Sequence, residues 1–244
     1  MYESEFPGSR IGTAAGERAV VTPGAARWAD APVAGVERMI LDSEGDGIGA
    51  RLTGFMRFAP GSGYPEHEHA AGEEILVLAG TLSDEHGSHH AGTYVRNAPG
   101  SRHEPHSPGG CTLFIKLRQF PADDRGSHLV DTRRLQWSRG RAAQASVMPL
   151  HAFGAERTRL VHWRSGVGGA PVRHPGGAEL LVLAGDFADE HGRYPPGTWM
   201  RLPDGCWHRP RAGRRGVLIW IKTGHLPASA RAIGAIDRTA EAAA

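Results

Sequence analysis

Gly72-Glu-Glu-Ile-Leu-Val-Leu-Ala-Gly80 is a short apolar run between glycines, and 105 positions later the chain repeats it as Gly177-Ala-Glu-Leu-Leu-Val-Leu-Ala-Gly185. An apolar run of this length, bounded by turn residues, is typical of a strand buried in a sheet. The agreement extends beyond the run, because Asp84-Glu-His-Gly87 recurs as Asp189-Glu-His-Gly192 at the same offset. The chain therefore carries one fold twice.

Both copies contain further short apolar runs separated by glycines. Thr112-Leu-Phe-Ile115 in the first copy corresponds to Val217-Leu-Ile-Trp-Ile221 in the second. The chain has 34 glycines and 17 prolines, and they lie between the apolar runs rather than in low-complexity tracts, so they indicate turns and not disorder. This density of turns predicts an all-β protein with an antiparallel barrel or sandwich in each copy.

The repeat also sets the expected domain organisation. A chain of 244 residues is long enough for two domains of about 100 residues, each with its own core. We expect an N-terminal arm or edge strand over residues 1–35, a first barrel over 36–121, a charged linker over 122–149, a second barrel over 150–227 and a C-terminal tail over 228–244, either frayed or a short helix.

The charge distribution argues against nucleic-acid and membrane partners. The 28 basic and 26 acidic residues leave a formal net charge of +2, and the basic residues are scattered. The N-terminus has no apolar run resembling a signal peptide, and no segment approaches the roughly 20 apolar residues that span a bilayer. We therefore expect a cytoplasmic protein that acts on a small molecule.

Cys111 and Cys206 occupy non-equivalent repeat positions and form no CxxC motif, so we expect two reduced thiols.

The chemical centre of the first copy is His67-Glu-His69, followed by Glu73 and later by His103. Residues i and i+2 of a strand point to the same face, so His67 and His69 can direct their imidazoles to one point. Glu73 can add a carboxylate from the next strand, and His103 can join from a strand that is distant in sequence. Spacing alone leaves Glu74 open as the carboxylate. Three imidazoles and one carboxylate suit Fe(II), Mn(II), Ni(II) or Zn(II).

Several other polar residues have secondary interpretations. Asp-Glu-His-Gly is present in both copies, which indicates turn chemistry and argues against catalysis by His86 or His191. We expect His89, His90 and His106 to be loop residues, with His106 a weaker candidate for contact with substrate or with a metal ligand. Two arginines, Arg96 and Arg102, could hold an anionic substrate group, although an exposed or structural role is the default.

The stretch Gly61 to Gly80 resembles the first motif of the cupins, and Pro99-Gly100-Ser-Arg-His103 resembles the second. The wider pattern, from Gly72 through Cys111, is more narrowly similar to the ChrR-like cupins, and the similarity covers residues 35 to 226 in two copies. The resemblance implies two tandem cupin barrels, that is, double-stranded β-helix or jelly-roll domains. It also implies one divalent metal ion in the first barrel, held by His67, His69, Glu73 and His103.

The second copy departs from this pattern at two of the implied ligand positions. Val172 stands at the first histidine position and Ala178 at the glutamate position, whereas His174 and His208 match the two other histidines. Glu179, the equivalent of Glu74, could complete a three-ligand remnant site if its side chain turned inward. We expect instead a second barrel that is retained for packing, because a missing ligand costs substantial metal affinity.

The resemblance implies two classes of function. Relatives of this cupin type resemble dioxygenases that cleave small diketones or aromatic hydroxyketones, which favours Fe(II) as the metal. The alternative is a sensor related to the ChrR anti-sigma factors, binding zinc without catalysis, and a purely structural metal is a third reading. Residues 1–35 contain no His and no Cys, so we expect neither the helical zinc domain that binds a sigma factor nor a sigma-factor partner. Cupins often pair edge to edge, so a monomer and a homodimer are both open.

Overall fold

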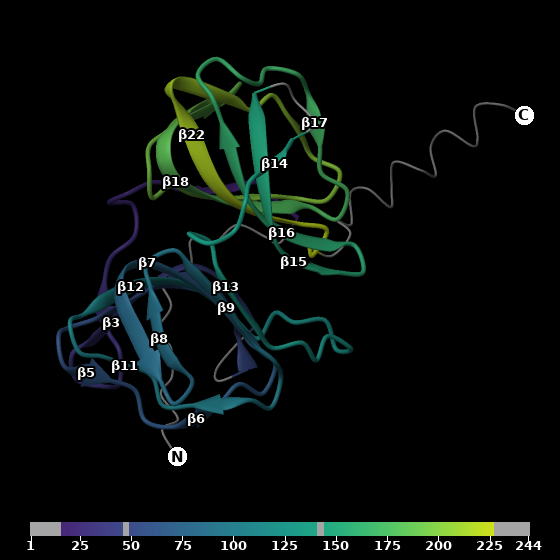
Figure 1. Ribbon diagram of the computed structural model, residues 1–244. Helices are drawn as coiled ribbons and strands as arrows, with labels where there is room; N and C mark the ends of the chain where they lie inside the picture. The colour runs from purple at the N-terminus through teal and green to yellow at the C-terminus, as the bar shows by residue number, and fades with distance from the viewer. Residues whose placement is uncertain (1–15, 46–48, 141–143, 227–244) are drawn as a thin grey trace, which may run out of the picture. The chain divides into compact units, whose positions relative to one another are not determined.

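The structure is a computed structural model that describes residues 16–45, 49–140 and 144–226 (Figure 1). These residues form strands β1 to β22, and no α-helix occurs among them. The described residues divide into two compact units, one of residues 26–135 and one that combines residues 16–25 with residues 136–226. The first part of the expected arm and the expected tail over 228–244 lie outside the described residues.

The first unit is built on a 10-stranded antiparallel sheet with the order β13-β9-β7-β12-β4-β3-β2, to which β5, β8 and β11 are added at the side. A separate two-stranded pair joins β6 to β10. The strands are β2 (Ala29–Asp30), β3 (Val36–Glu44), β4 (Arg51–Phe58), β5 (Ser62–Gly63), β6 (His67–Glu68), β7 (Glu73–Asp84), β8 (Gly87–His90), β9 (Thr93–Asn97), β10 (Arg102–His103), β11 (His106–Ser107), β12 (Cys111–Leu117) and β13 (His128–Asp131).

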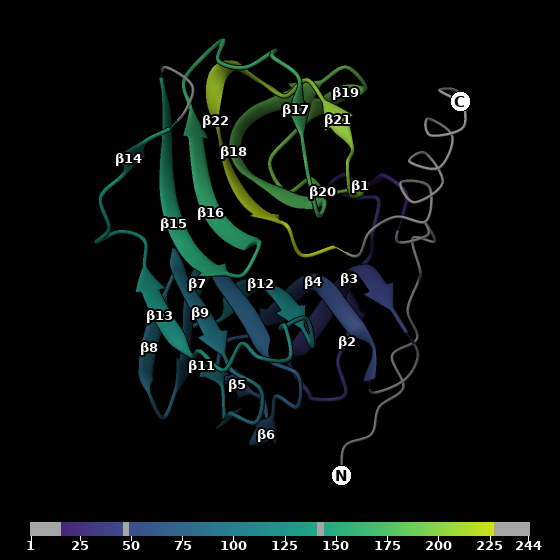
Figure 2. The same ribbon diagram turned by 90° about the vertical axis from the view of Figure 1, so that its right-hand side faces the viewer.

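The second unit repeats this plan with an 8-stranded sheet of order β1-β20-β18-β22-β16-β15-β14, with β19 added to β18, and a separate β17-β21 pair. Figure 2 shows β18 and β22 curving around the interior of this unit. Its strands are β1 (Ala19–Val21), β14 (Ser138–Arg139), β15 (Ala145–Phe153), β16 (Glu156–Trp163), β17 (Val172–Arg173), β18 (Ala178–Asp189), β19 (Gly192–Tyr194), β20 (Trp199–Leu202), β21 (Trp207–His208) and β22 (Arg211–Thr223). The predicted duplication of an all-β fold is confirmed.

Alternation along the strands gives each unit its own apolar core. In β7, Ile75 and Val77 are buried in the first core, and in β18, Leu180 and Val182 are buried in the second. The first core comprises Val36, Phe58, Ile75, Val77, Leu82, Val95, Cys111, Leu113 and Ile115. The second comprises Ala178, Leu180, Val182, Phe187, Tyr194, Met200, Leu202, Ala212, Val217 and Ile219.

The glycine that ends the repeated run is required by a close backbone approach. Gly80 has φ +72°, and a Cβ there would lie 2.0 Å from the carbonyl oxygen of Gly110. Gly185 has φ +80°, and a Cβ there would lie 2.2 Å from the carbonyl oxygen of Gly216. Both copies therefore need glycine at this position because a side chain would overlap the neighbouring strand.

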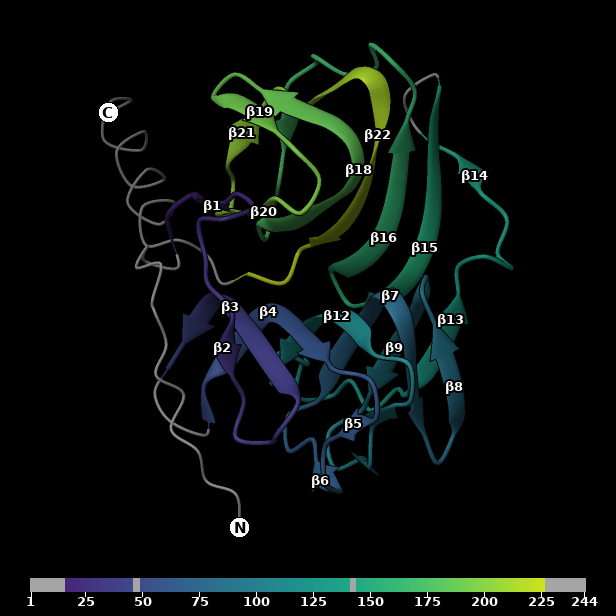
Figure 3. The ribbon, with the colours of Figure 1, turned by 90° about the vertical axis from the view of Figure 1, so that its left-hand side faces the viewer.

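Short edge strands occupy the segments outside the two repeats. Strand β1 pairs with β20 through Ala19 opposite Arg201 and Val21 opposite Trp199 (Figure 3). In the segment 122–149, strand β13 pairs with β9 of the first unit, whereas β14 and the beginning of β15 belong to the second. None of the described residues forms a helix with the length and apolar character needed to cross a membrane. Cys111 and Cys206 are both free thiols, as expected.

Candidate metal centre

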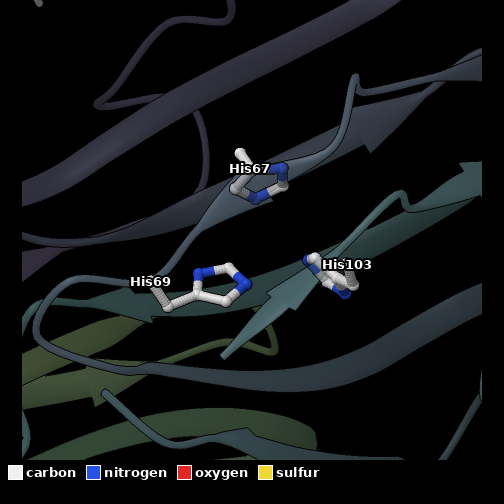
Figure 4. Close-up of side chains that lie close together, drawn as sticks. All are labelled: His67, His69 and His103. Carbon is white, nitrogen blue, oxygen red and sulfur yellow. The ribbon is translucent and has the colours of Figure 1, made fainter. Parts of the chain in front are cut away.

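The β6-β10 pair brings two of the predicted ligands together, because His67 lies opposite His103 in its register. The chain then turns after β6, and the carbonyl of His69 accepts hydrogen bonds from the backbone amides of Gly72 (3.2 Å) and Gly100 (2.9 Å). The three imidazole rings gather around one point (Figure 4), with ring centroids 4.7 to 5.0 Å apart. One nitrogen of each ring lies within 4.8 Å of the others.

Glu73, the first residue of β7, supplies a carboxylate to this cluster. Its Oε2 lies 3.3 Å from His69 Nε2 and 3.6 Å from His103 Nε2. The side-chain amide of Asn97 donates a hydrogen bond of 3.0 Å to the same oxygen. The Glu73 carboxylate therefore lies beside His69 and His103, two of the three gathered histidines.

Glu74 lies elsewhere, which answers the question that spacing left open. Its Oε1 accepts a 2.8 Å hydrogen bond from the Tyr94 hydroxyl and pairs with the guanidinium of Arg96. Arg96 in turn pairs with Asp124 at 2.6 Å. Since Glu73 and Glu74 are consecutive residues of one strand, their side chains point to opposite faces, and Glu73 is the one beside the histidines.

His67 presents its Nε2 to the cluster. Its Nδ1 lies 2.9 Å from the carbonyl oxygen of Pro65, which can only accept a hydrogen bond. The proton is therefore on Nδ1, and the lone pair of Nε2 is available to a metal. His67 is partly exposed, with the ring of Tyr64 5.4 Å away, whereas His69 and His103 are buried. His67 is therefore the least buried of the three imidazoles.

The side chain of His69 gives the strongest indication that a cation binds in the cluster. Its Nε2 is buried and has no hydrogen-bond partner within the part of the chain that the structure describes. Buried polar atoms without a partner are rare in folded proteins, because the lost hydrogen bonds to water are not replaced. A divalent ion among the three imidazoles and Glu73 would satisfy this nitrogen, so the residues present fit a metal of the first transition series.

The local charges favour an ionised carboxylate beside these imidazoles. Burial opposes ionisation of Glu73, but His69, His103 and the hydrogen bond from Asn97 outweigh it and hold the pKa of Glu73 below its usual value. Burial lowers the pKa of His69, and the positive charge that His103 could carry acts in the same direction. His69 is therefore neutral at neutral pH, the state in which it can bind a metal.

The family model of the ChrR cupin-like domain matches the chain over residues 16–121 and again over residues 125–227. The chain belongs to this family. The two matches coincide with the two repeats, so the protein is a tandem cupin in which both units have the fold of the family. No curated protein sequence matches the chain significantly.

Several solved structures of other proteins are similar in fold at low sequence identity. A candidate dioxygenase from Nostoc punctiforme is 13% identical with a TM-score of 0.72, covering 88% of this chain and 85% of that protein. A candidate glyoxylate-induced protein from Pseudomonas aeruginosa is 17% identical with a TM-score of 0.70, covering 89% and 90%. Oxalate decarboxylase from Bacillus subtilis, described with Mn(II) centres, is 11% identical with a TM-score of 0.61, covering 91% and 81%.

The second cupin unit keeps two histidines without the rest of the cluster. The Nε2 atoms of His174 and His208 lie 2.9 Å apart. Glu179 contacts His225 at 3.2 Å, and within the described residues it does not complete a three-ligand cluster with the two histidines. Burial, His208 and the charge of Arg159 lower the pKa of His174 to about 4, so His174 is neutral at neutral pH.

The structure corrects the interpretation of the loop histidines in the first unit and agrees with the default roles of the two arginines. His89, expected in a loop, is buried in β8, and its Nε2 lies 3.1 Å from Asp84 Oδ1. Arg96 is buried in its ion pairs, and Arg102 pairs with Glu68 at 2.5 Å on the surface, so both guanidinium groups are engaged. His90 and His106, also expected in loops, are exposed residues of strands β8 and β11.

Sequence reasoning missed two residues that surround the cluster. Asn97 donates to Glu73, and Asp84 Oδ2 lies 3.3 Å from His103 Nδ1. The sequence does contain one signal for Asp84, its recurrence in both copies, and the expected turn is confirmed: Asp84 Oδ1 accepts a 2.9 Å hydrogen bond from the backbone amide of His86. The contact of its other oxygen, Oδ2, with His103 depends on how distant strands meet in the barrel, which the sequence does not show.

Proposed function

We propose that the first cupin barrel binds one divalent metal ion through His67, His69, Glu73 and His103, and that the protein is a metal-dependent enzyme of the dioxygenase type. The observation that carries this proposal is the buried Nε2 of His69, which has no hydrogen-bond partner among the described residues and faces the carboxylate of Glu73 at 3.3 Å. Fe(II) is the favoured ion, and Zn(II), Mn(II) and Ni(II) are the alternatives that the donor set allows.

The proposed substrate is a small diketone or aromatic hydroxyketone, whose two adjacent oxygens can chelate one ion. A divalent metal in this place supplies Lewis-acid activation of such a chelating substrate. The partly exposed side of His67, next to Tyr64, is the proposed entrance. The apolar side chains of the barrel core, among them Phe58 and Val95, would exclude water from the bound substrate.

The protein groups have separate roles in this proposal. The Pro65 carbonyl holds His67 in the form that offers Nε2, and the Asn97 amide holds the Glu73 carboxylate beside His69. The single negative charge of Glu73 partly compensates a divalent cation, while the histidines contribute none. Similarity to the candidate dioxygenase from Nostoc punctiforme and to the Mn(II)-containing oxalate decarboxylase supports metal-dependent chemistry in a barrel of this shape.

Membership of the ChrR cupin-like family favours one other function, a cytoplasmic sensor that binds zinc without catalysis. The two functions differ in what the metal does: an enzyme consumes a substrate, whereas a sensor changes state or binds a protein partner. A homodimer is compatible with both.

Metal analysis of protein purified without added metal or chelator tests the proposal, followed by oxygen uptake with a panel of diketones and aromatic hydroxyketones. We expect about one equivalent of iron per chain and substrate-dependent oxygen uptake. One equivalent of zinc with no uptake across the panel would favour the sensor instead. A protein that neither contains nor binds a divalent metal would overturn both functions.

A further inference from the structure

The two carboxylate oxygens of Asp84 have different partners. Oδ1 accepts a hydrogen bond from the backbone amide of His86 (2.9 Å) and lies 3.1 Å from His89 Nε2. Oδ2 lies 3.3 Å from Nδ1 of His103. The side chains of Asp84, His89 and His103 are each no more than 5% exposed. The turn thus holds one oxygen of the carboxylate and leaves the other for His103.

This contact decides which nitrogen of His103 can bind a metal. An ionised carboxylate only accepts hydrogen bonds, so the proton of a neutral His103 ring must be on Nδ1. The lone pair is then on Nε2, the atom that lies 3.6 Å from the Glu73 carboxylate. The same hydrogen bond also fixes the orientation of the ring, as carboxylates do for many metal-binding histidines.

The second barrel contains the same carboxylate, but there it is used differently. Asp189 Oδ1 accepts hydrogen bonds from the backbone amide of His191 (2.8 Å) and from the hydroxyl of Tyr194 (2.8 Å), which stands at the repeat position of His89. Arg18 donates to Oδ2 at 2.9 Å, and His208 Nδ1 lies 3.8 Å from that oxygen. His208 Nδ1 has no hydrogen-bond partner in the described residues.

The Oδ2 atoms of Asp84 and Asp189 therefore have different partners. The difference correlates with the number of candidate metal ligands that each barrel contains. Where four ligand residues are present, Oδ2 contacts the histidine; where two have been replaced, an arginine takes the oxygen. A carboxylate needed only for its turn would have no reason to differ in this way, since the Oδ1 contacts to the turn are kept in both copies.

We propose that Asp84 is the positioning residue of His103: through Oδ2 it fixes the tautomer and ring orientation that offer Nε2 to a metal in the first barrel. This inference rests on the proposed metal site and names a residue on which its affinity depends. Asp189, whose Oδ2 is bound by Arg18, has no such role.

The first test needs no variant. Burial opposes protonation of His103, but the hydrogen bond to Asp84 outweighs burial and raises the pKa of His103, so metal-free, ¹⁵N-labelled protein is studied at a pH at which the ring is neutral. Long-range ¹H–¹⁵N NMR then reports which nitrogen of each histidine carries the proton, and the His103→Ala spectrum identifies the signals of His103. We expect the Nδ1–H tautomer in the unaltered protein. The Nε2–H tautomer would overturn the proposal.

The second test uses Asp84→Asn, which keeps the shape of the side chain. Its amide oxygen can still accept from the backbone of His86, while the NH₂ group then faces His103 Nδ1 and requires an acceptor there. We expect the Nε2–H tautomer in this variant and a Kd for Zn(II), measured by competition with a chromophoric chelator, that is about 10- to 100-fold higher. Asp84→Ser keeps an oxygen for the turn but cannot span to His103, and we expect its Kd to rise as well.

The matched control is Asp189→Asn, for which the Kd for Zn(II) should stay within about twofold of the unaltered protein. Melting curves of the metal-free variants establish that each is folded. If the unaltered protein does not bind Zn(II), the proposed metal site fails, and this inference with it. If it binds Zn(II) but Asp84→Asn leaves both the Kd and the tautomer unchanged, the metal site stands and the role of Asp84 is refuted.

Discussion

Glu73 and Glu74 are neighbours in β7, yet Glu73 lies 3.3 Å from His69, while Glu74 accepts a hydrogen bond from Tyr94 and pairs with Arg96. Both carboxylates are buried, so the two residues differ in their contacts and not in their exposure. One belongs to a cluster of potential ligands, and the other neutralises a buried guanidinium. The same substitution in the two residues should therefore have different consequences.

Glu73→Gln should weaken metal binding by about tenfold or more, because a neutral amide is a poorer ligand than a carboxylate. It should change the stability of the metal-free protein little, since Asn97 and the histidines can still hydrogen-bond to an amide. Glu74→Gln should instead lower the free energy of unfolding by about 3 kcal/mol, because it breaks a buried ion pair. This value is at the lower end for such a change, since Asp124 still neutralises Arg96.

Zn(II) titration and urea unfolding of both variants check this prediction. Equal loss of metal affinity in the two variants would contradict the placement of Glu73 as the carboxylate of the cluster.

His69→Ala or His103→Ala should remove most of the metal from the purified protein, because either change deletes one of the gathered imidazoles. His174→Ala should leave the metal content unchanged, since His174 contacts His208 in the other barrel. Elemental analysis of the three variants measures the effect. A drop in metal with His174→Ala would show that the second barrel also holds an ion.

The second barrel should lose stability in mild acid because of His174, whose pKa is lowered to about 4. An unfolded histidine titrates at about 6.5, so above that pH His174 is neutral in both states and contributes no pH dependence. Between pH 6.5 and 4 the unfolded chain binds a proton that the folded barrel does not. Stability therefore falls as the pH falls, by up to about 3 kcal/mol at pH 4.

His174→Gln should remove this part of the pH dependence. Urea unfolding of metal-free protein at several pH values, followed by tryptophan fluorescence, compares the variant with the unaltered chain. The unaltered chain should lose more stability than His174→Gln on going from pH 7 to pH 4.5. Parallel curves for the two proteins would mean that His174 does not titrate with a lowered pKa.

Gly80→Ala should destabilise the first barrel by about 2 to 5 kcal/mol, from a left-handed backbone and from overlap with the carbonyl oxygen of Gly110. Gly100 also has a positive φ, of +85°, but no atom lies within 4 Å of a Cβ placed there. Gly100→Ala should therefore cost only the backbone strain, about 1 to 2 kcal/mol. Thermal unfolding of both variants separates the two contributions, and equal costs would argue against the close approach at Gly80.

Much of the fold was predictable because the repeat shows it twice. The apolar run from Gly72 to Gly80 gave a buried strand in each copy, and the glycines between runs gave the antiparallel barrels. The histidine cluster was predictable as a set from the motif that His67, His69 and His103 form, although β6 ends at Glu68 and His69 lies in the turn that follows rather than on the same strand. These features depend on local pattern, which a single sequence contains.

The features that sequence did not resolve depend on contacts between distant residues. Alternation says that Glu73 and Glu74 face opposite ways, but not which of the two faces the histidines. The turn at Asp84 is a local property, whereas its contact with His103 depends on how β7 and β10 meet in the barrel. The sequence predicts a loop at His89 because a short polar strand such as β8 has no alternation of apolar residues.

Strand β1 has a consequence for the order in which the protein is made. Residues Ala19–Val21 are synthesised before the first barrel, yet their partners on β20 are synthesised after it. The sheet edge at β20 can therefore close only after the whole first barrel has been translated, and the same holds for the contact of Arg18 with Asp189. A truncation or fusion near the N-terminus would thus disturb the barrel that lies farther away in the sequence.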